Sequence, residues 1–287
     1  MRPLCCIFLL PTLLLAACMM PPQLEPLQLS GETVIDGPAQ WHGEVRIDGR
    51  VIVTRSGSLS IAPGTKVLFM PRDDDGDGIG DGELLIEGSL AALGTREQPI
   101  LFTSGSESPQ PADWKFLYLD FARHGELNHV ISEYAYSGVQ VHFCKATIHD
   151  SVFRHNVDGV RFSTVNLELA YNDIYGNTHG IRYEERRGKA QVHHNDIRDN
   201  DIGIFVVTRA EDRSRFEFNN LAGNRYYSVK MGLTQSDDIS LPRNWWGTTD
   251  VTAIAETLLD ARVDSTLGEV HVREPLMAPL EDAGRRK

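Results

Sequence analysis

Four short stretches decide the fold of this chain: GVQV (residues 138–141), GVRF (159–162), GIRY (180–183) and GIFV (203–206). Their glycines are separated by 21, 21 and 23 residues. The residues three places before the four glycines are Ala135, Asn156, Asn177 and Asn200. Asn224 continues this series of asparagines. The chain therefore repeats one unit several times.

Each unit has the pattern of β-strands, because apolar and polar residues alternate within it. A period of roughly 20–24 residues built from strands and turns predicts one coil of a solenoid per repeat. Coils stacked at the strand spacing of about 4.8 Å place equivalent residues above one another. We therefore predict asparagine ladders, in which each amide donates to the next and accepts from the previous one. The predicted ladders join Asn156 with Asn177 and Asn200, and Asn172 with Asn195.

Further stretches extend this pattern along most of the chain. They are GSLSIAPGTKVLF (57–69), GELLIEGSLAALGTREQPILFTS (82–104) and PRNWWGTTDV (242–251). They resemble the opening coils and the closing segment of right-handed parallel β-helix proteins, the pectate-lyase-like superfold, and in particular its bacterial surface members. The resemblance implies an all-β chain with coils of about 21–24 residues, a β-helix over 31–250, and a short helix, cap and tail over 251–287. It implies no activity, because this fold carries enzymes, adhesins and inert surface proteins.

The N-terminus, MRPLCCIFLLPTLLLAAC (1–18), has the layout of a secretory signal. Its apolar run is shorter than the ~20 residues of a spanning helix. The last four residues resemble a bacterial lipobox, which implies cleavage before Cys18 and lipidation of its thiol and amine. We thus predict a signal peptide over 1–17, a proline-rich tether over 18–30 and a membrane as partner. Met19, rather than Asp, favours the outer membrane by resemblance to the usual sorting pattern. The alternative is a plain signal peptide with an unrelated cysteine.

Charge and cysteine content exclude some classes of protein. The 287 residues carry a net charge of -12, which argues against nucleic acid as a partner. Once Cys5 and Cys6 leave with the signal and Cys18 is lipidated, Cys144 remains alone, so no intramolecular disulfide is expected. The sequence leaves the oligomeric state open.

One segment, PRDDDGDGIGDGELL (71–85), concentrates acidic residues between glycines. Its spacing, D-x-D-x-D-G-x-x-D, matches the first part of a calcium loop. The predicted ligands of a structural Ca2+ ion are the side chains of Asp73, Asp75, Asp77 and Asp81 and the carbonyl of Ile79. Position twelve is Leu84 rather than Glu, so the segment resembles dockerin or thrombospondin type 3 loops more than an EF-hand. The alternative is a solvated acidic loop.

Counting from each repeat glycine assigns side chains to columns. The next residue points inward, as Val160, Ile181 and Ile204 do. The predicted outward columns are Gln140, Arg161, Arg182 and Phe205, and then His142, Ser163, Glu184 and Val207. A further column stands just before the glycine, and its members Asp158 and His179 are expected at the edge of this outer face; the column is Ser137, Asp158, His179 and Ile202.

Two sets of candidate site residues follow from these columns. Guanidinium groups bind carboxylates bidentately, so the candidate residues for binding an anionic sugar are Arg161, Arg182, His142 and Glu184. Asp158 beside His179 is a candidate acid–base pair. The alternative is that the arginines only pair with Asp158 or Glu184.

Two histidine features are predicted to carry no metal site. His149 and His193 share a column but lie two coils apart, at roughly 9–10 Å from the strand spacing, which is too far for one ion. His193 and His194, as neighbours in a strand, are expected on opposite faces.

The chain has no motif of a pectate lyase, a polygalacturonase or an alginate epimerase. We expect a non-catalytic, envelope-anchored lipoprotein with a binding or structural role and carbohydrate as its ligand. The alternative is a polysaccharide lyase or glycoside hydrolase that acts on an anionic glycan through Asp158, Arg161, His179 and Arg182.

Overall fold

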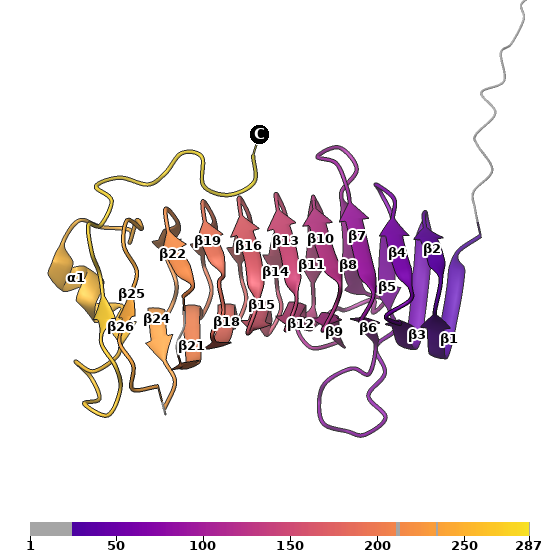
Figure 1. The fold of residues 1–287 in the computed structure, drawn as a ribbon, viewed down its shortest axis with the longest axis horizontal. Helices are drawn as coiled ribbons and strands as arrows, with labels where there is room; N and C mark the ends of the chain where they lie inside the picture. Colours follow the sequence, from indigo (N-terminus) through magenta and orange to yellow (C-terminus); the bar gives the residue numbers. More distant parts are fainter. Residues whose placement is uncertain (1–24, 211–212, 234, 287) are drawn as a thin grey trace, which may run out of the picture.

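The computed structural model describes residues 25–210, 213–233 and 235–286. The predicted signal peptide, Cys18 and most of the predicted tether lie outside these residues. The described chain is a long solenoid of stacked coils, with its first strand at one end and its one helix near the other (Figure 1). Within these ranges, no helix has both the length and the apolar character to cross a lipid bilayer.

Three walls of parallel strands enclose the core, and most coils give one strand to each wall. Face A consists of β6 (Glu83–Ile86), β9 (Trp114–Asp120), β12 (Ala135–His142), β15 (Asp158–Ser163), β18 (His179–Arg186), β21 (Ile202–Ala210), β24 (Tyr227–Met231) and β26 (Leu258–Leu259). Face B consists of β5 (Lys66–Phe69), β8 (Ile100–Ser104), β11 (Val130–Glu133), β14 (Val152–Arg154), β17 (Asp173–Tyr175), β20 (Asp196–Arg198) and β23 (Asn220–Ala222). Face C consists of β2 (Pro38–Trp41), β4 (Ser58–Ile61), β7 (Ser89–Leu93), β10 (His124–Asn128), β13 (Lys145–His149), β16 (Asn166–Ala170), β19 (Gln191–His193) and β22 (Arg215–Glu217).

The two ends of the solenoid differ. At the N-terminal end, β1 (Leu27–Ile35) pairs along its whole length with β3 (Glu44–Val53), which continues into both face A and face B. The solenoid therefore begins inside the segment 18–30 that was predicted as tether, because Leu29 already packs against the core. At the other end lie β25 (Ile239–Ser240), α1 (Val251–Glu256) and β27 (Val270–His271).

The inward column of face A follows the predicted alternation. Its members are register partners from coil to coil and are at most 1% exposed: Val139, Val160, Ile181, Ile204, Val229 and Leu258. One such coil could not bury its own apolar side, so each coil depends on its neighbours for stability.

Both predicted asparagine ladders are present, and both are longer than predicted. In the first, the Nδ2 of Asn156, Asn177 and Asn200 each donates to the Oδ1 of the next member, ending at Asn224. The second runs through Asn172, Asn195, Asn219 and Asn244. The repeat glycines belong to this arrangement. A Cβ at Gly180 would lie 2.7 Å from the carbonyl oxygen of Gly203 and 2.8 Å from the Nδ2 of Asn200, so only glycine fits beneath the next coil.

After most strands of face C, and again after β25 at the end of the stack, the chain turns through a left-handed backbone conformation. The turn residues stack above one another with φ between 49° and 59°: His129, Asp150, Tyr171, His194, Phe218 and Arg243. This turn corrects the prediction that His193 and His194 face opposite sides. Because His194 has left the strand, its ring centroid lies only 5.1 Å from that of His193.

Candidate functional site

The outward positions of face A form one polar row along the solenoid. Its members are register partners on successive strands, spaced by about 4.8 Å, and are Tyr118, Gln140, Arg161, Arg182, Phe205 and Lys230. The sequence predicted the middle four. It missed Lys230 because Ser228 replaces the repeat glycine of that coil, so the count from glycine had no starting point.

Basic side chains surround Phe205, one of the two aromatic members of this row. The guanidinium carbon of Arg182 lies 5.7 Å from the ring centroid of Phe205, and the Nζ of Lys230 lies 5.5 Å from it. His179 also stacks on Phe205, with ring centroids 4.9 Å apart. The middle of the row therefore combines three basic side chains with one ring face, which is a combination suited to an anionic sugar.

The predicted acid–base pair is in contact. Asp158 is fully buried, and its Oδ1 lies 2.7 Å from the Nδ1 of His179. Its other oxygen accepts from the NH1 of Arg182 at 3.5 Å. A buried carboxylate needs such partners, because an unpaired charge is costly to bury. The pair is thus both a possible proton relay and the anchor that orients Arg182.

His142 lies beside the row and is held as a neutral imidazole at pH 7. Its Nδ1 lies 3.0 Å from the hydroxyl of Tyr118, and its Nε2 lies 3.4 Å from the Nε2 of Gln140. Burial, followed by the charge of Arg161, lowers the pKa of His142 to about 4. Burial and the nearby Asp120 carboxylate raise the pKa of Tyr118 to about 12.

The structure corrects one predicted column. His142, Ser163 and Glu184 are register partners as expected, but a bulge between Tyr183 and Glu184 shifts the next strand. Glu184 therefore pairs with Thr208 and not with Val207. The residue types on these two strands did not indicate this bulge. Glu184 still belongs to the site, because its Oε1 lies 3.9 Å from the NH2 of Arg161.

Unpaired polar atoms gather on the same face. Across the described residues, six side chains bury a polar atom that has no hydrogen-bond partner, and three of these side chains lie on β12 and β18. They are the Oγ of Ser137, the Oε1 of Gln140 and the Nε of Arg182. Because buried polar groups normally find partners, these three atoms leave hydrogen-bonding capacity unused just beneath the row.

Residues 114–244 match the family model described as a right handed beta helix region. This protein is a right-handed parallel β-helix. No curated protein and no solved structure matches the chain. The matched part of the β-helix contains the whole row from Tyr118 to Lys230, so the candidate site lies in the regular coils of the β-helix and not in an insertion.

The acidic loop joins β5 to β6 of the β-helix, and three of its carboxylates converge. The carboxylate oxygens of Asp73, Asp75 and Asp77 lie within 4.8 Å of one another, and all three side chains are exposed. Gly76 and Gly78 have positive φ, and their amides donate to Asp73. The glycines thus permit the turn that brings the carboxylates together.

Asp81, the fourth predicted ligand, faces a different way. Its Oδ1 accepts from the Nζ of Lys115 at 3.2 Å, and its Oδ2 accepts from the amide of Asp74 at 2.8 Å. Ile79 has its amide bonded to the Oδ1 of Asp77. Three predicted side-chain ligands are therefore grouped, while Asp81 ties the loop to β9. A hollow of about 500 Å³ separates the loop from the body, with Arg50, Arg72 and Lys115 in its lining.

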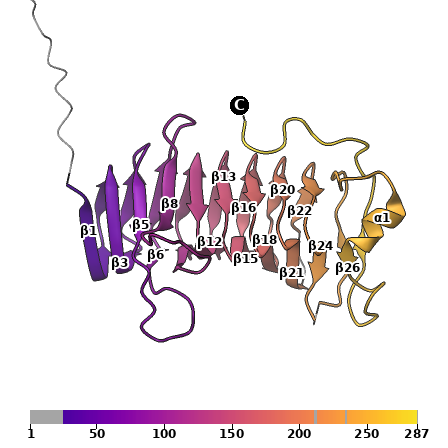
Figure 2. The same ribbon diagram turned by 180° about the vertical axis from the view of Figure 1, so that it is seen from behind.

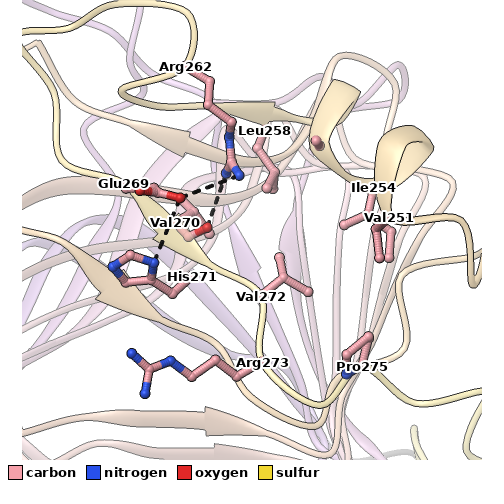
Figure 3. A pocket seen from close by; sticks show the side chains of 11 residues that line it. Val251, Ile254, Leu258, Arg262, Glu269, Val270, His271, Val272, Arg273 and Pro275 are labelled. Carbon is pink, nitrogen blue, oxygen red and sulfur yellow. Dashed lines mark hydrogen bonds and ion pairs between the residues drawn. The ribbon is translucent and has the colours of Figure 1, made fainter.

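A second hollow, of about 270 Å³, lies at the capped end of the β-helix (Figure 3). Its lining is mixed, with the apolar side chains of Ile254 and Leu258 on one side and charged side chains on the other. Arg262 and His271 both point toward Glu269, at 3.7 Å and 3.8 Å (Figure 3). This hollow shares no residue with the row, and its one carboxylate, Glu269, already lies beside Arg262 and His271.

Proposed function

We propose that this β-helix is a non-catalytic, lipid-anchored protein of the bacterial cell envelope that binds an anionic polysaccharide along the row. The observation that carries the proposal is the side-by-side placement of Arg161 and Arg182, with Lys230 further along the same row. The protein has a net charge of -12, which repels polyanions over most of its surface. Three cations in one row create a local positive potential that attracts an anionic ligand.

The remaining features of face A fit a sugar ligand. Phe205 offers a ring face between two cations, and rings of this kind pack against the apolar faces of sugars. The exposed parts of the Arg161 and Arg182 guanidinium groups can donate to hydroxyl and carboxylate groups of the sugar. A linear polymer is favoured over a small ligand, because the row follows the long axis of the solenoid.

The binding test is a titration with oligosaccharides of uronic acids, compared with neutral oligosaccharides of the same length. Binding of the uronic acids alone, with loss in Arg161→Ala/Arg182→Ala, supports the proposal. Arg46→Ala is the control, since Arg46 is an exposed arginine on β3. Equal binding of neutral sugars would contradict it.

A lyase or hydrolase activity is the second candidate, and the 2.7 Å contact between Asp158 and His179 favours it. Incubation with the same oligosaccharides distinguishes the two candidates. Unsaturated products would indicate a lyase, new reducing ends without unsaturation would indicate a hydrolase, and either product would have to disappear in Asp158→Asn. Binding without product supports the non-catalytic proposal.

Anchoring through Cys18 rests on the sequence alone. Labelled palmitate should enter the wild type, and Cys18→Ser should lose the label and leave the membrane fraction. A wild type that takes up no label would refute the anchor. The proposed location is the outer membrane, on the basis of Met19.

We include a structural Ca2+ ion held by Asp73, Asp75 and Asp77. Hard carboxylate oxygens suit calcium, and the group has no nitrogen or sulfur ligand that would favour zinc. The ion would relieve repulsion between the three carboxylates and stiffen the loop.

A further inference from the structure

The C-terminal segment does not end at the cap. After α1 and β27 it runs back along one edge of the β-helix toward the middle of the molecule (Figure 1, Figure 2). It contacts the coils one after another in reverse order. The amide of Leu276 donates to the carbonyl of Asn244 at 3.0 Å, and the amide of Gly284 donates to the carbonyl of His194 at 2.9 Å. We call residues 276–286 the strap.

The side chain of Asn220 binds the backbone of the strap. The amide of Leu280 donates to the Oδ1 of Asn220 at 2.9 Å, and the Nδ2 of Asn220 donates to the carbonyl of Leu280 at 3.1 Å. Asn220 belongs to neither asparagine ladder. Its side chain thus supplies the same pair of hydrogen bonds that a neighbouring strand would supply, which is a mode used to bind extended peptides.

Two arginines complete the contact. Arg286 donates to Asp150 from its backbone amide, from Nε at 2.8 Å and from NH2, and its guanidinium lies 4.4 Å from the ring centroid of Tyr171. Arg285 donates to Asp173 at 3.4 Å from both its amide and its Nε. Asp150 is only 2% exposed with the strap in place, and Arg286 supplies the counter-charge that a covered carboxylate needs.

The position before the arginines accepts only glycine. Gly284 is buried with φ of +87°, and a Cβ there would lie 2.5 Å from the Oδ1 of Asp173. Any other residue would push the Asp173 carboxylate aside and would also strain the left-handed backbone. This edge of the β-helix therefore selects glycine at position 284 of the strap, whereas non-specific packing would tolerate other residues.

We infer that this edge is a peptide-recognition groove for an extended segment containing Gly-Arg-Arg, formed by Asp150, Tyr171, Asp173, His194 and Asn220 and filled in cis by the strap. A peptide with the strap sequence makes the same contacts when it is supplied by another molecule. Such a peptide competes with the strap for the groove. This inference is independent of the glycan row, because the two share no residue.

The test uses the full chain and a labelled peptide of residues 276–286. In Arg285→Ala/Arg286→Ala the strap loses its charged contacts while the groove stays intact. The peptide should bind this variant about tenfold or more tightly than the wild type, because the docked strap lowers the binding-competent fraction. Arg273→Ala, an exposed arginine before the strap, is the matched control and should bind like the wild type. A peptide with Gly284→Ala should not bind.

Hydrogen exchange gives an independent readout. The amides of Leu280 and Gly284 should be protected in the wild type and should lose protection in the double-arginine variant. A folded variant that does not bind the peptide would overturn the inference. If the variant does not fold, the same experiment is done on the wild type with excess peptide. The peptide should displace the strap and accelerate hydrogen exchange at the amides of Leu280 and Gly284. Unchanged exchange would contradict the groove.

Discussion

Arg161 and Arg182 are register partners on β15 and β18, so two guanidinium groups lie side by side on the outer face of adjacent coils. Each side chain keeps about a fifth of its surface exposed, at 23% and 21%. Arg182 has the buried carboxylate of Asp158 as counter-ion, whereas Glu184 lies 3.9 Å from Arg161. Like charges at one strand spacing repel, and an anionic ligand that bridges both would relieve this repulsion.

The substitution Ile181→Asp tests which side chains of face A point into the core. Ile181 is fully buried, and a carboxylate at that position costs several kcal/mol, which should unfold the domain. Glu184→Gln on the same strand should change the free energy of unfolding by at most about 0.5 kcal/mol, because the side chain is 37% exposed. Arg182 is a poor control because it contacts Asp158. Equal melting temperatures for the two variants would contradict the assigned phase.

The asparagine ladder is tested by Asn177→Ala. The Nδ2 of Asn177 donates to the carbonyl of Phe153 at 3.0 Å and to the Oδ1 of Asn200 at 2.9 Å. Alanine leaves these buried acceptors short of a donor, so we expect a loss of about 3 kcal/mol in denaturant titrations. Asn166→Ala, at an exposed position on β16, should lose no more than about 0.5 kcal/mol. A loss at Asn177 as small as that at Asn166 would show that the ladder does not stabilise the fold.

Calcium should raise the melting temperature of the protein. Binding to the folded form alone adds about 2.7 kcal/mol at a hundredfold excess over the dissociation constant. The measurement compares melts in calcium and in chelator. Asp75→Asn/Asp77→Asn should abolish the difference, and Glu107→Gln, outside the loop, should preserve it. If the wild type melts at the same temperature in both solutions, the calcium site is refuted and the segment is a solvated acidic loop.

Stability should fall as the pH decreases from about 6.5 to about 4, because of His142. Its folded pKa is lowered from 6.5 to about 4, so between these values the unfolded chain binds the proton and the folded chain does not. Stability is therefore highest above pH 6.5 and decreases toward pH 4. The full shift corresponds to about 3 kcal/mol before allowance for solvent at the ring. His142→Gln should flatten this part of the pH profile, and an unchanged profile would refute the assignment to His142.

Much of the fold could be predicted from the sequence, because stacking makes each coil repeat its neighbour. The spacing of Gly159 and Gly180 gave the period, and alternation then placed Ile181 inside and Arg182 outside. What failed were local departures from the repeat. The bulge at Glu184 and the left-handed turn at His194 depend on backbone geometry that the residue types did not indicate.

The candidate site shows the same division. Arg161, Arg182, Asp158 and His179 were found by counting from the glycine, whereas Lys230 was missed where Ser228 interrupts the count. The strap groove could not be predicted at all. The contact between Asp150 and Arg286 joins residues 136 positions apart in the chain, and no periodicity relates them.

The most direct test of the proposed function is the affinity for oligosaccharides of uronic acids, measured by calorimetry on wild type, Arg161→Ala/Arg182→Ala and Arg46→Ala. Each charge-assisted contact is worth about 1.5–3 kcal/mol, so the double variant should lose at least about a hundredfold in affinity. Arg46→Ala should bind like the wild type. Equal affinities for all three proteins would contradict a glycan site on the row.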